Sequence, residues 1–237
     1  MSLFRNVILV AAIAGLFAGL AMAAMQSYAT APLIMQAEVF ENARQADGGD
    51  RAETADRGHQ AWAPEDGLER TSYTVLANIV TAIGFAIVFV ALAEFAGGLT
   101  GWRQGMIWGL AVFGAVTLAP GLGLPPELPA MPVADLAARQ VWWLGTVGAT
   151  AVGLALIAFG SNGLAAIAGV ALIVAPHLIG APQPLSHETP IPESLHHQFV
   201  VMSTLTSLIF WLVLGGLCGL VRPRLMASGD ADGASLA

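Results

Sequence analysis

Most of the chain's histidines gather in one short stretch of the sequence, where they are joined by carboxylates. The stretch contains His177, His187, Glu188, His196 and His197. Neutral imidazole is the commonest protein ligand of transition metals, and imidazole combined with carboxylate suits cobalt, nickel or zinc. Prolines recur through the stretch and restrict its backbone. The pattern predicts a metal-capture loop. The alternative is a loop whose histidines only cap helices or reach the membrane interface.

A second proline-rich stretch, residues 118–132, adds Glu127 to the candidate metal ligands. Its prolines predict that a helix ends there. Within a membrane protein, non-helical backbone is tolerated only where it is buried in protein or lines a water-filled cavity. Glu127 is therefore expected to be an ordered carboxylate near the outer mouth. The alternative is a stiff, exposed turn.

The composition is that of a membrane protein. Of 237 residues, 56% are hydrophobic and 11% are charged, whereas soluble domains average about 25% charged residues. Apolar runs long enough to span a bilayer are predicted at 7–27, 75–95, 106–122, 141–159, 164–179 and 199–221. We expect an all-α integral membrane protein with about six transmembrane helices. The count is five if the first helix is cleaved as a signal peptide, or if the fourth and fifth are merged.

Helix parity and arginines predict the topology. Positive charge marks the cytoplasmic side, and with six helices Arg5, Arg103, Arg222 and Arg224 fall on one side. The opposite side receives both proline-rich stretches and an acidic extracytoplasmic loop at about 37–71, which carries the fifth histidine, His59. We expect residues 1–226 to form a single transmembrane domain. Residues 227–237 are expected to be a disordered tail.

Glycines at four-residue spacing predict close helix packing, because small residues let helix backbones approach. They are Gly15 and Gly19 in the first helix, Gly101, Gly105 and Gly109 around the start of the third, and Gly215 and Gly219 in the last. The alternative is an ordinary lipid-facing run. Glu94, near the inner end of the second helix, is a functional candidate because an ionisable group within a span is costly.

Several functions are excluded or disfavoured by the residues that are present. All nine basic residues are arginines and the net charge is −7, so no basic patch for nucleic acid is predicted. The single cysteine, Cys218, allows neither a disulfide framework nor a redox pair. No phosphate-binding loop or zinc-hydrolase spacing occurs. We expect a protein that is not an enzyme.

The stretches LAPGLGLPPELPAMPVADLAARQVWW, APHLIGAP and HHQF resemble the CbtA family of proposed cobalt transporter subunits. The resemblance implies a multi-pass subunit in the inner membrane of a bacterium, which takes up cobalt for cobalamin synthesis with a single-span, histidine-bearing partner of the CbtB type. It places His177 first among the metal ligands, followed by Glu127 and His196 or His197. The family is often described with five spans, and our six differ from that. Cobalt, nickel or zinc is then transported cargo, with no permanently bound cofactor.

Two other classes of function stay open at this stage. One is a haem- or quinone-associated helical bundle, with His177 and His197 as axial ligands. The other is a membrane assembly subunit that transports nothing. A haem absorption band would identify the first, and unchanged metal accumulation after histidine substitution would favour the second.

Overall fold

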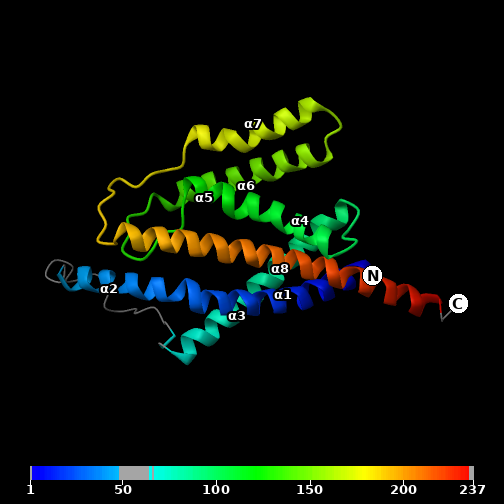
Figure 1. The fold of residues 1–237 in the computed structure, drawn as a ribbon, viewed down its shortest axis with the longest axis horizontal. Coiled ribbons are helices and arrows are strands. Elements are labelled where there is room, and N and C mark those ends of the chain that lie inside the picture. The colour runs from blue at the N-terminus through cyan, green and yellow to red at the C-terminus, as the bar shows by residue number, and fades with distance from the viewer. Residues whose placement is uncertain (1, 48–63, 66, 235–237) are drawn as a thin grey trace. The chain divides into compact units, whose positions relative to one another are not determined.

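A computed structural model describes residues 2–47, 64–65 and 67–234. Within these residues every regular element is helical (Figure 1). Five helices are long and apolar enough to cross a membrane, and Gly163–Ile179 is a shorter apolar helix. The prediction of an all-α membrane protein with five or six spans is confirmed.

The chain forms two compact units that are each built from distant parts of the sequence. Unit 1 comprises Met1–Met25, Thr74–Leu118 and Leu205–Ala237, and unit 2 comprises Gln26–Tyr73 and Ala119–Thr204. Helices α1 (Ser2–Ala29), α3 (Leu68–Phe95) and α8 (Glu193–Ala234) each contribute residues to both units. That residues 1–226 fold as a single domain stays a prediction.

Unit 1 is held together by small residues. Gly15 and Gly19 of α1 lie so close to α3 that a Cβ atom on Gly15 would be 2.5 Å from the Ile83 Cα atom. Alanines 11, 14 and 18 of the same helix are fully buried. Helix α1 is therefore part of the core of unit 1.

Helix α4 (Trp102–Phe113) packs equally closely on α8 within unit 1. A Cβ atom on Gly105 would collide with the carbonyl of Gly215, and one on Gly219 would collide with the carbonyl of Gly101. The predicted close packing at these glycines is confirmed, and the structure shows that the two glycine runs face each other. Beyond α4 the chain forms a π-helical turn, η1 (Gly114–Leu118), and the short α5 (Ala119–Gly123). Pro120 explains the wider turn, because it has no N–H to continue the regular hydrogen-bond ladder.

In unit 2, α6 (Leu136–Phe159) and α7 (Gly163–Ile179) run side by side as an antiparallel hairpin (Figure 1). Asn162 caps α7 by accepting a 2.9 Å hydrogen bond from the Ala165 N–H. Gly153 and Gly169 allow close contact, since a Cβ atom on Gly153 would lie 2.6 Å from the Gly169 carbonyl oxygen. The predicted turn between two helices is confirmed.

Helix α2 (Ala31–Asp47) occupies sequence that we expected to be loop. Pro32 suits the first turn of a helix, and the residues after it are mostly good helix formers. Leu33 and Ala37, one turn apart, are buried against Leu128 and α8 residues. The acidic loop expected at 37–71 is therefore shorter: α2 extends to Asp47 and α3 begins at Leu68. His59 lies outside the described residues.

Helix α8 also differs from the sequence prediction at its carboxyl end. It is described to Ala234, whereas disorder was expected from Ala227. Extending an established helix costs far less than starting one, so weak helix formers can continue it. Residues 235–237 lie outside the described part of the chain.

Candidate functional site

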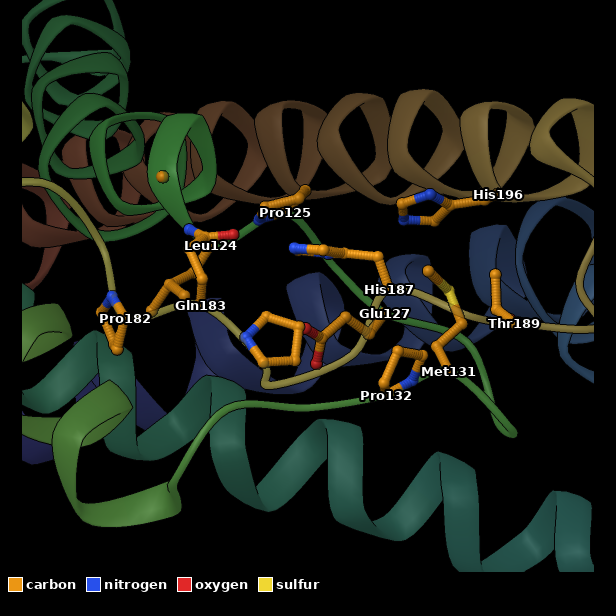
Figure 2. A pocket seen from close by; sticks show the side chains of 12 residues that line it. Leu124, Pro125, Glu127, Met131, Pro132, Pro182, Gln183, His187, Thr189 and His196 are labelled. Carbon is orange, nitrogen blue, oxygen red and sulfur yellow. The ribbon is translucent and has the colours of Figure 1, made fainter.

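A pocket of about 150 Å³ lies in unit 2, between the two proline-rich loops and the first turn of α8. It brings together three of the predicted metal ligands: Glu127, His187 and His196. Figure 2 shows the side chains of Glu127, Met131 and His187 beside one another, with His196 projecting from α8. Residues that are 69 positions apart, from Glu127 to His196, thus line one opening.

His196 is oriented by the loop opposite to it. Its Nε2 atom lies 3.1 Å from the Pro126 carbonyl oxygen. A carbonyl only accepts hydrogen bonds, so this contact requires the proton on Nε2. The Nδ1 lone pair is then left as the ring's donor to a metal. The hydrogen bond therefore selects the tautomer that a ligand at this position needs.

The loop that carries Glu127 is anchored by apolar burial and one strained residue. Leu128 is buried with residues of α2 and α8. Ala130 has a φ of 65°, which is rare for a residue with a Cβ atom. The Met131 N–H then donates a 3.2 Å hydrogen bond to the Leu128 carbonyl. This tight turn places Met131 in the pocket wall.

The carboxylate of Glu127 is paired from α6. Arg139 Nη2 lies 2.9 Å from Glu127 Oε2, and the two side chains are 28% and 20% exposed. Arg139 is fixed near the amino end of α6, whose first turn is capped by the Asp135 carboxylate. This ion pair holds the carboxylate of Glu127 beside α6.

His187 comes from the second proline-rich loop and is exposed. The loop is tied down shortly afterwards by Ile191, which is buried and whose N–H donates to the Thr189 hydroxyl at 3.2 Å. Thr189 itself lines the pocket. His187 is thus the pocket ligand with the greatest freedom to adjust to an incoming ion.

The other predicted ligands lie outside the lining of this pocket. His177 is in the last turn of α7, where its ring meets the Trp142 ring edge-on at 6.0 Å between centroids. Trp142 also donates a 3.3 Å hydrogen bond to the Pro176 carbonyl. Glu188 and His197 are exposed. The histidine-rich stretch is therefore divided between a pocket and the surrounding surface.

The described residues contain no group of three or more His, Cys, Asp or Glu side chains arranged to hold a metal ion. The pocket instead presents separate donors around an open space, with Met131 and Gln183 beside them. Such an arrangement lacks the closed ligand shell of a structural metal site. It is compatible with an ion that binds briefly as cargo.

Sequence reasoning did not identify two features of this site. One is the pairing of Arg139 with Glu127, and the other is the place of Met131 in the pocket wall. The only sequence signal for the first was opposite charges on either side of a proline-rich turn, which does not reveal a contact. No sequence signal indicated the second, because Met131 follows Ala130, which adopts a left-handed conformation although it is not a glycine.

These features define a multi-pass helical membrane protein with a pocket of imidazole, carboxylate and thioether groups. The chain belongs to the CbtA family, described as a probable cobalt transporter subunit, whose profile matches residues 4–222. That family is a transporter subunit family rather than an enzyme family, and a subunit implies a partner. Comparisons with curated proteins and with solved structures gave no significant match.

Proposed function

We propose that this protein is the membrane subunit through which a cell takes up Co²⁺ for cobalamin synthesis. Membership of a family described as a probable cobalt transporter subunit carries the proposal. The pocket supports it, because imidazole and carboxylate suit divalent cobalt and its near neighbours nickel and zinc. The ion is transported substrate, and no permanent cofactor is part of the proposal.

We propose that capture takes place at the pocket, by Glu127, His187 and His196. The three side chains line one opening, and His196 is held in a tautomer that leaves a ring nitrogen free to bind an ion. His177, Glu188 and His197 were predicted as ligands from the sequence and lie outside that lining. We assign them no direct contact with the captured ion, and the experiments below test this choice.

The capture face is assigned to the outside of the bacterial inner membrane. The loops after α5 and before α8 both line the pocket, so they share one end of the bundle. In a six-span count, an odd number of spans separates each of Arg5, Arg103, Arg222 and Arg224 from those loops, and the positive-inside rule assigns these arginines to the cytoplasmic side. The six-span count includes α7. This helix has 17 residues and is therefore about 25 Å long, which is short for a membrane span.

Transport also needs an energy source and a partner. A cation that enters a negative interior gains about 2.3 kcal/mol per charge per 100 mV, so membrane potential favours inward movement of Co²⁺. The partner is proposed to be a single-span, histidine-bearing subunit of the CbtB type. It would deliver the ion to the pocket or complete its open ligand set.

Uptake of radiolabelled Co²⁺ tests this function. Cells that lack their own cobalt importers would express the chain alone, the CbtB-type partner alone, both, or neither, with membrane insertion checked in each case. The proposal predicts uptake that requires this chain and is strongest with the partner. Absence of uptake from inserted protein, with the partner present and with Ni²⁺ and Zn²⁺ also tried, would reject the importer function and favour an assembly subunit.

A further inference from the structure

The ion pair between Glu127 and Arg139 has a consequence for any cation that enters the pocket. Glu127 is the one carboxylate in the pocket lining, and Arg139 lies 2.9 Å from its Oε2 atom. The negative charge that would attract Co²⁺ is therefore already balanced by a guanidinium. With His187 and His196 neutral, as metal ligation requires, Glu127 and Arg139 sum to zero charge.

We propose that Arg139 acts as a built-in competitor of the transported cation, which keeps capture at Glu127 weak and rapidly reversible. This inference rests on the proposed function and names a regulatory element of the same site. A divalent ion bound by the Glu127 carboxylate would lie only one carboxylate away from the positive guanidinium of Arg139. Repulsion between the two cations opposes binding, and it is strong because both side chains are mostly shielded from water.

The geometry favours competition over a purely supporting role. Orienting a carboxylate ligand requires only a hydrogen-bond donor, which need not carry a charge. Arginine carries a permanent positive charge. It is also held on α6, a regular helix capped at Asp135, so it cannot simply leave with the loop when an ion arrives.

A weak site suits transport. An ion must bind well enough to enter a pathway but weakly enough to leave it again. The open donor set described above and the charge-balanced carboxylate both weaken retention. Removing the positive charge of Arg139 should therefore make Co²⁺ bind more tightly and leave the pocket more slowly.

The test measures Co²⁺ binding to the purified full-length protein in detergent by equilibrium dialysis, and release by trapping the freed ion with a chelator. Arg139→Gln is expected to lower the Kd for Co²⁺ by roughly tenfold or more, because one repelling charge is removed, and to slow release by a similar factor. Arg139→Lys retains the positive charge and should bind like the wild type. The double variant E127Q/R139Q should bind no more tightly than Glu127→Gln alone.

A matched control is available in the same unit. Arg70 pairs with Glu38 at 2.6 Å, outside the pocket lining, so Arg70→Gln makes the same change in net charge and should leave the Kd unchanged. Folding of each variant is checked by size-exclusion chromatography. Unchanged or weaker Co²⁺ binding by folded Arg139→Gln would overturn the inference while leaving the site intact. If the wild type itself binds no Co²⁺, the proposed site fails and the inference fails with it.

Discussion

Glu94 of α3 and Arg222 of α8 form an ion pair with two hydrogen bonds. The two residues are 128 positions apart in the sequence. Arg222 Nη2 donates to Glu94 Oε2 at 2.7 Å, and its Nε atom donates to Oε1. A third bond runs from Nη1 to the Leu99 carbonyl at 2.8 Å. Arg222 thus joins the end of α3, the turn before α4 and the last part of α8 within unit 1. Glu94, which the sequence indicated as a functional candidate, has a structural partner here.

Breaking this pair should destabilise the protein. The two side chains are only 16% and 17% exposed, so Glu94→Gln leaves a mostly buried guanidinium without its counter-charge. We expect a loss of about 2 kcal/mol, less than a fully buried unpaired charge costs. Thermal unfolding of the detergent-solubilised protein measures it. The double variant E94Q/R222Q should recover part of the loss, and a Glu94→Gln protein as stable as the wild type would show that the pair contributes little.

A methyl group added at the α4–α8 contact should also destabilise unit 1. Gly105→Ala places a Cβ atom against the backbone carbonyl of Gly215, and backbone cannot rotate away as a side chain can. Overpacking of this kind costs about 1–3 kcal/mol. The same unfolding measurement detects the loss.

Gly84→Ala in α3 is the matched control, because a Cβ atom there would meet no heavy atom within 4 Å. Alanine has the higher helix propensity, so this variant should be as stable as the wild type or slightly more stable. Equal stability of both alanine variants would show that α4 and α8 do not approach as closely as described.

Sidedness can be read with single cysteines. The native Cys218 is fully buried, so it should give little background with a membrane-impermeant maleimide. Leu185→Cys lies in the loop before α8 and should be labelled in intact cells, whereas Thr100→Cys, in the turn between α3 and α4, should be labelled only after lysis. The opposite pattern would place the pocket on the cytoplasmic face and reverse the proposed direction of capture.

Helices and their close contacts were largely predictable from this sequence. Apolar runs and glycine spacing are local patterns, and the glycines do lie at close helix contacts, although the spacing did not indicate that Gly105 would meet Gly215. Helix α2 was missed because its amphipathic signal is weak: burial of Leu33 and Ala37 depends on contacts with Leu128 and α8 that are distant in sequence. Tertiary packing, rather than a local pattern, therefore determined that this segment is helical.

The site was predictable only in part. The closeness of the histidines in the sequence indicated a site, but it does not determine which way each side chain points. His196 lines the pocket, whereas His197, the next residue of the same helix, does not. Successive helical residues point about 100° apart. The contact between His196 and Pro126 likewise joins the first turn of α8 to a loop whose path no local pattern specifies.

Uptake by two paired-histidine variants tests the central claim most directly. H187Q/H196Q removes both pocket imidazoles, whereas H177Q/H197Q removes two imidazoles outside the pocket lining, so the variants are matched in number and chemistry. In cells without other cobalt importers, and with equal amounts of inserted protein, we predict that H187Q/H196Q loses most Co²⁺ uptake and H177Q/H197Q retains most of it. Full uptake by H187Q/H196Q, or loss confined to H177Q/H197Q, would contradict capture at this pocket.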